Sequence, residues 1–325
     1  METALSVRTG ARNATGVSRL EERIRYIESM VANGGPDPSE YAAFGVWLKE
    51  VDEDLRAGYM SRADLSVLRR AFGEALSSET LQGFSYSKPH GYSGDFEIID
   101  RIYTEHTSDN THLRKWDVYC HSQSGPKAVR NRKSYFVQLL RALASASGSD
   151  ENASVLNVAS GPCRDILEFL SDPGDKPCDF QFECVDSDAQ AIEFAGNLCS
   201  PFASQVSFTK ANALRYRPNR QFRLIWSAGL FDYLEDNAFA FLLTNLLSML
   251  EDKGELVIGN FARGNPTRPY MEIVGDWYLN HRSDGDLVRL AKACGIHQRD
   301  IRIGQEPEGV NLFLHIKRGR RFIGS

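Results

Sequence analysis

The densest group of reactive side chains in the sequence lies between Lys88 and Asp95. The run reads Lys-Pro-His-Gly-Tyr-Ser-Gly-Asp, so Lys88, His90 and Tyr92 offer a cation, an imidazole and a phenol. A cation can position an anionic substrate, and an imidazole can take the proton of a reacting hydroxyl or amine. Asp95 has a simpler alternative role as the cap of a helix that begins at Phe96. We therefore predict that Lys88 binds substrate and that His90 and Tyr92 act in catalysis.

Two arginines in a predicted helix over residues 126–146 form a second candidate group. Arg130 and Arg132 flank Asn131, and residues two apart on a helix point to different faces. A guanidinium binds a carboxylate through two parallel hydrogen bonds, which fix its direction as well as its distance. We predict that one arginine binds a carboxylate of the substrate or of a cofactor, and that the other is solvated or ion-paired. The sequence leaves open which of them faces the pocket.

The third group lies in residues 260–282, an unusually long connection that is rich in aromatic and acidic residues. Long connections in compact domains are often functional lids. The alternative is a hydrophobic plug that packs against helices nearer the N-terminus. We predict that Tyr270 and Glu272 lie nearest the substrate and act in catalysis, and that Trp277 lines the substrate pocket.

Strands and helices alternate beyond residue 148. This alternation requires crossover connections and predicts an α/β fold with a largely parallel sheet covered on both faces. Residues 304–310 are too short for a crossover helix, so the last two strands should pair as an antiparallel hairpin. The predicted strands cover residues 155–159, 180–185, 206–210, 224–227, 255–260, 301–303 and 311–316, with helices at 189–198 and 237–250.

Helical periodicity dominates the sequence before residue 147. The Ser- and Gly-containing run over residues 144–152 has the composition of a linker. We predict three parts: a mobile N-terminus over residues 1–17, a helical cap domain over residues 18–147 and an α/β domain over residues 148–325. The predicted helices cover residues 19–30, 40–55, 61–76, 96–103 and 126–146, and residues 85–95 are predicted to form a loop.

The run Val155–Asp165 reads as a strand that enters a tight turn and opens a helix. Ligands of such sheets bind at the carboxyl ends of the strands. We predict that Ala159 and Gly161 form a cofactor loop, because a glycine lets the backbone approach a ligand closely. One glycine alone does not distinguish a cofactor loop from an ordinary turn between a strand and a helix.

The end of the second predicted strand strengthens this interpretation. Asp186 follows Gly161 by about 25 residues, and a carboxylate at this place can accept both hydroxyls of a ribose. We predict that Asp186 and its neighbour Ser187 bind the nucleoside part of a cofactor. Asp188 is better explained as the N-cap of the helix over residues 189–198.

The next two strand ends complete the predicted cofactor site. Asn212 and Ala213 follow the third strand and are predicted to contact adenine. Ser227 and Asp232 follow the fourth strand and are predicted to contact the cofactor, with Tyr233 facing the substrate, although Asp232 has an alternative role as a helix cap. The full Gly-x-Gly-x-x-Gly pattern is missing, so these loops favour S-adenosylmethionine (SAM) over a nicotinamide dinucleotide.

Composition excludes several other classes. The formal net charge of −5 argues against a nucleic-acid partner, which usually requires a basic face. Six cysteines without a Cys-x-x-Cys pair indicate neither a zinc site nor a disulfide framework, and we predict no metal. The sequence has neither a signal peptide nor an apolar run long enough to span a membrane. We therefore expect a cytoplasmic monomer or homodimer.

Three runs resemble one bacterial class I methyltransferase family, which is named for the biosynthesis of an extracellular factor, 3-hydroxypalmitic acid methyl ester. They are Lys88–Asp95 with the following Phe96, Ala128–Arg132 and Ala159–Asp165, within a likeness over roughly residues 83–317. The resemblance implies SAM as methyl donor, S-adenosylhomocysteine (SAH) as product and a helical cap over the acceptor pocket. It also implies a carboxyl group as acceptor.

Together, the motifs and the resemblance predict an enzyme that transfers a methyl group from SAM to a small polar, carboxylate-bearing metabolite. Carboxyl O-methylation is the form that the resemblance implies. One alternative is N- or S-methylation of an amino-acid-like metabolite, which the many charged residues near the predicted pocket favour. The other alternative is a non-catalytic SAM-binding protein.

Overall fold

The chain divides into two compact units in a computed structural model that describes residues 19–146, 152–172, 174 and 179–319. One unit, here called the helical unit, comprises Met1–Gly94, Thr104–Pro126 and Pro266–Tyr278. The other, the sheet unit, comprises Asp95–Tyr103, Lys127–Asn265 and Leu279–Ser325. The predicted mobile N-terminus and most of the predicted linker lie outside the described residues, and the three-part division stays a prediction.

The helical unit contains no strand among its described residues. Its core is aromatic: the Phe44 ring lies 4.9 Å from the Tyr119 ring and 6.0 Å from the Trp116 ring. Trp47 and Phe72 extend this cluster. The elements are a helix over residues 19–32, η1 (Pro38–Glu40), α2 (Tyr41–Arg56), α3 (Arg62–Arg70), η2 (Gly73–Leu76), α4 (Leu81–Ser87), α6 (Arg114–Ser122) and α11 (Arg268–Ile273).

Several predicted boundaries in this part of the chain need correction. The helix predicted over residues 61–76 ends at Arg70, and the predicted loop over residues 85–95 begins only after Ser87, where α4 ends. Helix α6 was not predicted, because its buried Asp117 interrupts the apolar pattern of that segment.

The cap role of Asp95 is confirmed in the sheet unit. Its carboxylate accepts hydrogen bonds from the backbone N–H groups of Glu97 and Ile98, at the start of α5 (Phe96–Tyr103).

The sheet unit is built on one seven-stranded sheet in the order β3-β2-β1-β4-β5-β7-β6. Strands β1 to β5 run parallel, and β7 runs antiparallel to both β5 and β6, so the predicted hairpin is confirmed. The strands are β1 (Asn152–Val158), β2 (Asp179–Asp186), β3 (Val206–Lys210), β4 (Phe222–Ser227), β5 (Leu250–Phe261), β6 (Ile301–Gln305) and β7 (Asn311–Lys317).

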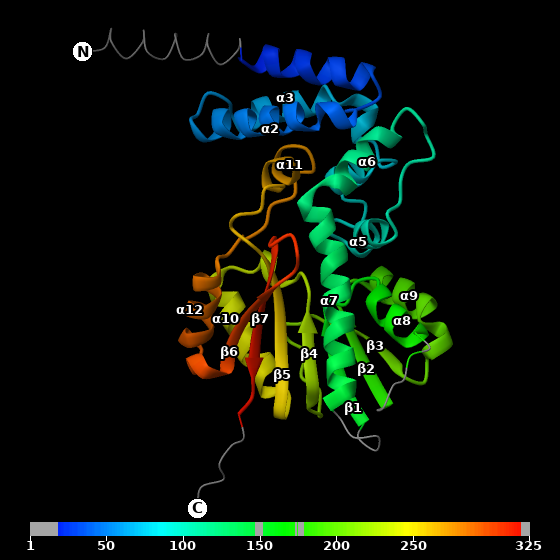
Figure 1. The fold of residues 1–325 in the computed structure, drawn as a ribbon, viewed down its shortest axis with the longest axis vertical. Coiled ribbons are helices and arrows are strands. Elements are labelled where there is room, and N and C mark those ends of the chain that lie inside the picture. Colours follow the sequence, from blue (N-terminus) through cyan, green and yellow to red (C-terminus); the bar gives the residue numbers. More distant parts are fainter. Residues whose placement is uncertain (1–18, 147–151, 173, 175–178, 320–325) are drawn as a thin grey trace, which may run out of the picture. The chain divides into compact units, whose positions relative to one another are not determined.

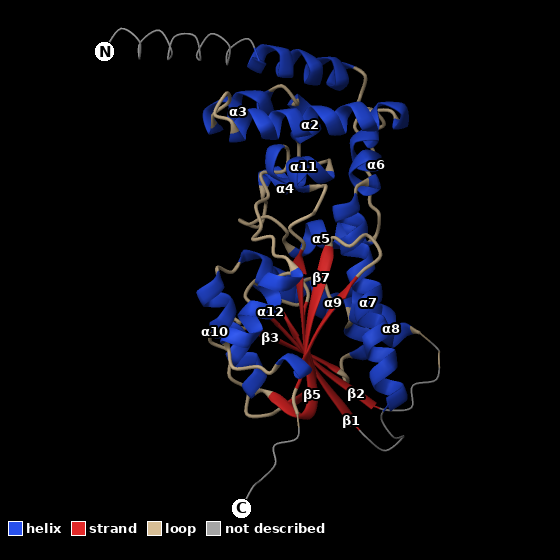
Figure 2. Ribbon diagram, turned by 60° about the vertical axis from the view of Figure 1, so that its left-hand side comes forward, coloured by secondary structure: helices blue, strands red, loops and turns tan. Residues whose placement is uncertain are grey.

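Helices cover both faces of this sheet (Figures 1 and 2). Successive strand residues face opposite sides, so Val155 and Leu224 pack towards α7, α8 and α9, whereas Leu156 and Ile225 pack towards α10 and α12. Each fully buried side chain of this kind contributes roughly 1.5–3 kcal/mol. These helices are α7 (Ser124–Ala146), α8 (Arg164–Ser171), α9 (Ala189–Leu198), α10 (Asp236–Ser248) and α12 (Asp284–Ala293), with the short turns η3 (Ser200–Phe202), η4 (Phe231–Tyr233) and η5 (Gln298–Asp300).

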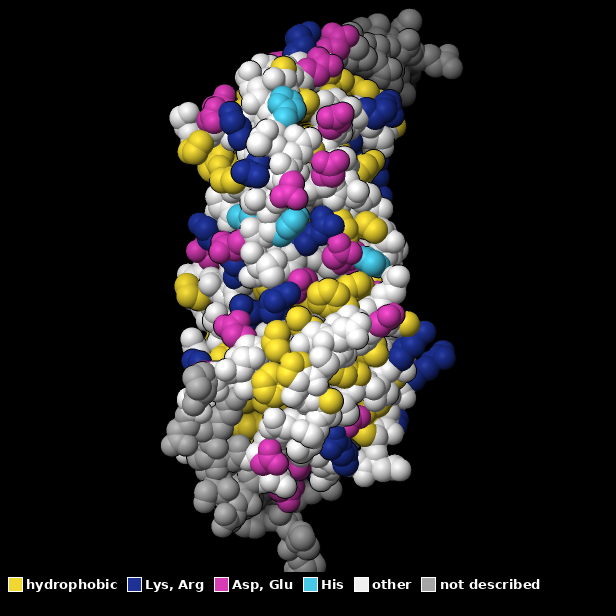
Figure 3. Space-filling view, turned by 90° about the vertical axis from the view of Figure 1, so that its right-hand side faces the viewer, with side chains coloured by type: hydrophobic (Ala, Val, Ile, Leu, Met, Phe, Trp, Pro, Cys, Tyr) yellow, Lys and Arg dark blue, Asp and Glu magenta, His cyan; other side chains and the backbone are white. Residues whose placement is uncertain are grey.

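The surface carries mixed charge. On the face shown in Figure 3, Lys and Arg side chains are interspersed with Asp and Glu, and the described residues of this face form no extended basic field. None of the helices within the described ranges is both long and apolar enough to cross a membrane.

Candidate functional site

The loop between β1 and α8 contains three residues in the left-handed backbone region. Their φ angles are 52° at Ala159, 56° at Gly161 and 54° at Cys163. This conformation is free for glycine but costs roughly 1–2 kcal/mol for other residues, and such strain concentrates at functional loops. A Cβ on Gly161 would meet no atom within 4 Å, so the backbone conformation and not crowding requires glycine there. The space beside Gly161 is open to a ligand.

Asp186 binds this loop directly. The Gly161 N–H donates to its Oδ2 at 3.0 Å, and the Asp188 N–H donates to its Oδ1 at 3.0 Å. The two residues meet because β1 and β2 are parallel neighbours, with Val158 paired to Val185. Burial raises the pKa of Asp186, while these N–H groups lower it. Each carboxylate oxygen still has a lone pair that could accept a ligand hydroxyl.

The two residues after Asp186 differ in exposure and in bonding, and the cofactor role of Ser187 stays a prediction. Ser187 is exposed, and Asp188 is confirmed as the N-cap of α9, because its carboxylate accepts from the Gln190 N–H at 2.8 Å. The Ala211 N–H donates to the Asp186 carbonyl at 2.8 Å. The loop after β3 is therefore fastened to the end of β2.

The predicted cofactor residues in the loops after β3 and β4 differ in how exposed they are and in what they bond to. Asn212 is exposed, and its side-chain oxygen accepts from the Leu214 N–H at 2.9 Å, whereas Ala213 is half-buried. Ser227 is fully buried, and its hydroxyl donates to the Val158 carbonyl at 3.1 Å. That hydroxyl ties β4 to β1, so its proton is already used within the sheet.

Asp232 is buried in η4 and bound to β5. Its Oδ1 accepts from the Phe261 N–H at 2.6 Å, and its carbonyl accepts from the Asn280 N–H at 2.7 Å. The carboxylate therefore links two strand ends, whereas the N-cap of α10 is Glu235. The neighbouring Tyr233 is 42% exposed.

Arg282 organises the same loop and was not predicted to be part of the site. Its Nη1 donates to the Phe231 carbonyl at 3.0 Å and to the Asn260 Oδ1 at 2.9 Å, and its Nη2 donates to Asp236 at 3.1 Å. The side chain is buried, so it acts as an internal clamp. The sequence signal for it is its place at the end of the long connection over residues 260–282, within the family likeness over roughly residues 83–317.

The Asp232 carboxyl should make stability depend on pH. Burial raises its pKa to about 7, although the hydrogen bond from the Phe261 N–H and the charges of Arg132 and Arg282 act to lower it. Because an unfolded Asp releases its proton near pH 3.9, Asp232 contributes stability that is fully present below about pH 4 and is lost as the pH rises through about 7. We expect Asp232→Asn to flatten this decline.

Thermal melts between about pH 4 and about pH 8 measure the effect as the wild-type minus variant difference in Tm. Asp188→Asn is the matched control, because Asn also caps helices well. A difference for Asp232→Asn that does not change over this range would contradict the assignment.

Of the two arginines predicted from the sequence of α7, Arg132 is the one that the fold buries. It is 6% exposed, and its Nη1 lies 3.1 Å from the position that a Cβ on Gly229 would occupy. Tyr103 forms a side-chain hydrogen bond with it. Burial raises the pKa of Asp165 to about 6, although Arg132 opposes this rise. Arg130, two residues earlier, is half-buried.

Two buried polar atoms beside these loops have no hydrogen-bond partner among the described residues. They are the Ser160 hydroxyl, in the loop after β1, and the Arg132 Nε. A buried donor without a partner costs about 1–3 kcal/mol, so each such group calls for an explanation. A ligand that accepts hydrogen bonds is one explanation.

In the helical unit, Lys88 belongs to an ion-pair network. Its Nζ lies 2.7 Å from the Asp276 Oδ2, and the Arg69 Nη2 lies 3.0 Å from the Asp276 Oδ1. Arg69 also donates to the carbonyls of Glu272 and Ile273 at 2.7 and 2.8 Å. Lys88 and Asp276 both have φ at 49°, so the pair is held on strained backbone. The partners lie about 190 residues apart, so no local pattern could reveal them.

Tyr270 lies in the aromatic core of the helical unit. Its hydroxyl donates to the Gln82 Oε1 at 2.7 Å, and its ring lies 5.3 Å from the Tyr119 ring. Burial raises the pKa of Tyr270 well above its usual value. The hydroxyl is thus engaged in a structural bond, and a catalytic role for it stays a prediction.

The other predicted acceptor residues of the helical unit are more accessible. The Glu272 carboxylate pairs with the Arg268 Nε at 2.6 Å. Trp277 and His90 are half-buried, and Tyr92 is 39% exposed. Their roles also stay predictions. Among the described residues, no three His, Cys, Asp or Glu side chains gather in a way that could hold a metal ion.

No protein-family model and no curated protein sequence matches the chain. Solved structures do resemble it. A possible exported protein from Bordetella parapertussis is 14% identical, with a TM-score of 0.59 over 94% of this chain and 97% of that chain. A magnesium protoporphyrin IX methyltransferase from Synechocystis PCC 6803, with bound SAH, is 14% identical, with a TM-score of 0.50 over 72% of this chain and 97% of that chain. The fold is the Rossmann-like fold of class I methyltransferases, as predicted.

Proposed function

We propose that the chain is a SAM-dependent methyltransferase that acts on a small polar, carboxylate-bearing metabolite. The observation that carries this proposal is the Asp186 carboxylate, buried at the end of β2 and bonded to the strained Gly161 loop of β1. In this class of sheet, the carboxyl ends of neighbouring strands are where a nucleoside-bearing ligand binds.

The described residues fit the chemistry of SAM. Gly161 leaves open space, Asp186 keeps acceptor capacity for two ribose hydroxyls, and the Ser160 hydroxyl lacks a partner among the described residues. The buried Arg132 guanidinium, with its Nε unbonded within the described chain, suits the carboxylate of the methionine part. Arg132 shares the sheet unit with Gly161 and Asp186, so we assign it to the cofactor.

Bound SAM would supply an electrophilic methyl carbon, to which an acceptor lone pair bonds while the sulfur takes the electron pair of the breaking bond. The chain's own residues bind and orient. Asp186 would hold the ribose, and Asn212 and Ala213 would flank the adenine. Asp232 holds the loop after β4 against β5 through the Phe261 N–H, which keeps that loop in place during transfer.

For the acceptor we propose carboxyl O-methylation, in keeping with the family resemblance. A carboxylate is already nucleophilic and needs cations or other donors to position it rather than a base. Lys88, Arg130, Tyr233 and Trp277 are proposed to bind the acceptor, and His90, Tyr92, Tyr270 and Glu272 to orient its reacting group. Lys88 is paired with Asp276, and the Asp276 carboxylate partly neutralises the positive charge that Lys88 could offer to an acceptor.

Transfer of labelled methyl from SAM tests this proposal. The wild-type chain is incubated with methyl-labelled SAM and a panel of small hydroxy- and amino-carboxylates. We expect label that alkali releases as volatile methanol, because methyl esters hydrolyse in base whereas N- and S-methyl groups do not. Alkali-stable label would contradict O-methylation but keep the methyltransferase. If no label is transferred to any compound and SAH does not bind, the proposed function fails.

A further inference from the structure

A cavity lies at the edge of the sheet opposite to the proposed cofactor site. It has a volume of about 520 Å³ and is lined by the second half of α7, the start of β4, the start of β5 and the end of β7. Because β4 and β5 are parallel and β7 runs against them, these segments meet at the amino edge of the parallel strands. The proposed cofactor site is at the carboxyl edge, so the two sites are separate.

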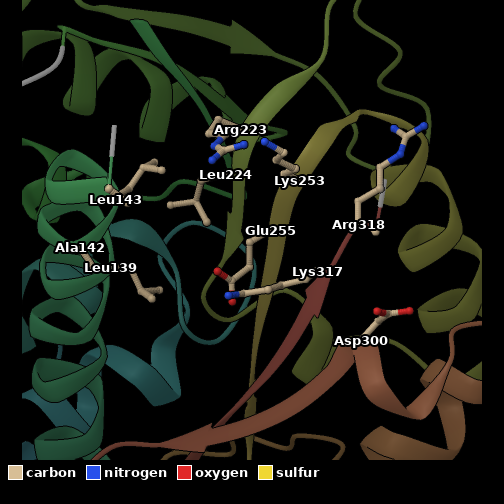
Figure 4. Close-up of a pocket in the computed structure, with 12 residues that line it drawn as sticks. Leu139, Ala142, Leu143, Arg223, Leu224, Lys253, Glu255, Asp300, Lys317 and Arg318 are labelled. Atoms are coloured by element: carbon tan, nitrogen blue, oxygen red, sulfur yellow. The ribbon is translucent and has the colours of Figure 1, made fainter. Parts of the chain in front are cut away.

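One wall of this cavity is apolar. Leu139, Ala142, Leu143 and Ala146 follow the helical spacing that places them along one side of α7, and Leu224 of β4 joins them. Leu139 and Leu143 are only partly buried by their contacts with the sheet core. In Figure 4, these leucines lie beside the polar part of the cavity. They leave apolar area available to a ligand.

The other side is cationic, in a chain of net charge −5. Four basic side chains and two acidic ones line it: Arg223, Lys253, Lys317 and Arg318, with Glu255 and Asp300.

The acidic side chains already have partners. Glu255 accepts from His315 Nδ1 at 2.7 Å and lies 3.8 Å from Arg302. Burial alone would raise the pKa of Glu255, but the hydrogen bond from His315 and the charges of His315, Lys317 and Arg302 hold it below its usual value. Asp300 lies 3.9 Å from Arg299. Both acidic side chains of the cavity thus lie near positive charge.

Two of the cations that line the cavity, Arg223 and Lys253, lack a strong partner within the described part of the chain. Arg223 makes one long contact, 3.5 Å to the Asp252 carbonyl, and Lys253 forms no hydrogen bond or ion pair within the described part of the chain. In Figure 4, the Arg223 and Lys253 side chains point towards each other. Like charges placed together repel, and an anion between them relieves that repulsion.

The backbone under Lys253 is strained in a way that places this cation. The pairing of β4 with β5 shifts register between Phe222 and Leu224, so residues 251–254 bulge from the sheet. Lys253 has φ at 66°, a left-handed conformation that glycine or asparagine adopts at lower cost. The strained backbone therefore carries a side chain that has no hydrogen-bond or ion-pair partner within the described protein.

We propose that this cavity binds an amphiphilic anion, a carboxylate or phosphate on an apolar body. The anionic group lies between Arg223 and Lys253, and the apolar body covers Leu139, Leu143 and Leu224. The volume is within the range of small-molecule sites, and the apolar wall and the cationic side match the two parts of such a ligand. This site is independent of the proposed methyl transfer.

Calorimetry with four probes tests the proposal on the full chain. Octanoate and octyl phosphate carry both parts of the ligand, octanol lacks the charge, and inorganic phosphate lacks the apolar body. We expect either amphiphilic anion to bind at least about tenfold more tightly than octanol and than inorganic phosphate. Equal affinity for octanol and octanoate, or binding of none of the probes, would overturn the proposal.

Variants locate the binding. Arg223→Gln/Lys253→Gln should weaken octanoate binding by about tenfold or more, and Leu143→Asp should weaken it similarly. Arg289→Gln/Lys292→Gln removes the same charge from exposed positions of α12 and should leave it unchanged. SAH affinity should be unchanged in all of them, which also shows that they fold. Unaltered octanoate binding in the Arg223/Lys253 variant would place the ligand elsewhere.

Anionic phospholipid vesicles distinguish the two sources of this chemistry. If the ligand is free in solution, octanoate binds and vesicles do not sediment the chain. Sedimentation with vesicles together with octanoate competition would identify a lipid headgroup as the source and still support the cavity. If the chain sediments with vesicles, octanoate does not displace it from them and octanoate itself does not bind, the proposed cavity site is overturned.

Discussion

Replacing Asp186 with Ala is expected to reduce SAM and SAH affinity by about a hundredfold or more. The carboxylate can accept both ribose hydroxyls, and each charge-assisted bond is worth roughly 1.5–3 kcal/mol. The change also removes the acceptor of the Gly161 and Asp188 N–H groups, so the loop after β1 loses its anchor. Isothermal titration with SAH measures the effect directly, without knowledge of the acceptor.

Two further variants make this result specific. Asp188→Ala removes a carboxylate two residues away that caps α9, so it should cost about 1 kcal/mol of stability but little SAH affinity. Asp186→Asn keeps one acceptor oxygen and should fall between wild type and Asp186→Ala. SAH affinity that is unchanged in a folded Asp186→Ala variant would show that the ribose is not bound here.

Replacing Arg132 with Lys is expected to lower SAH affinity by about tenfold to a hundredfold. Lysine keeps the charge, but it lacks the planar pair of N–H groups that holds a carboxylate in one direction. The guanidinium is buried beside Gly229, and its Nε is unbonded among the described residues. Because the position is buried, solvent cannot easily supply the hydrogen bonds that the lysine variant lacks. A matched Arg130→Lys change, at a half-buried position, should have little effect on SAH.

A truncated ligand shows which carboxylate Arg132 binds. 5′-Methylthioadenosine has the nucleoside of SAH without its amino acid, so Arg132→Lys should leave its affinity unchanged if Arg132 holds the SAM carboxylate. Equal losses for both ligands would indicate a general loss of structure, which a thermal melt would also reveal. Normal SAH affinity with reduced turnover would instead assign Arg132 to the acceptor.

The loops at the carboxyl ends of the strands could be predicted because they depend on local sequence. Residues 189–198 were predicted as a helix with Asp188 as its cap, and α9 has these bounds. Gly161 and Asp186 could be related because parallel strands end at the same edge of a sheet, although the direct bond between them needed the structure. The hairpin of β6 and β7 followed from the length of the segment between them.

For the residues proposed to contact the methyl acceptor, the sequence could supply only the residue types and not their positions in space. Tyr270 and Glu272 follow β5 in the sequence, yet Pro266–Tyr278 belongs to the helical unit, where the Tyr270 hydroxyl bonds to Gln82. The Lys88–Asp276 pair and the Arg282 clamp join segments whose separation has no periodicity. Long-range contacts of this kind depend on how the helices and strands pack, and no short sequence pattern indicates which distant residues will meet.

The sequence by itself determined the alternation of strands and helices, the order of the loops at the carboxyl ends and the residue types within them, because each follows from short-range periodicity and capping. Only the tertiary structure decided which side chains are available. It buried Arg132 beside the β4 loop, used the Ser227 hydroxyl to join two strands, and raised the pKa of Asp232 to about 7 by burial. Burial and partnership depend on residues that are distant along the chain, and the fold alone brings those residues together.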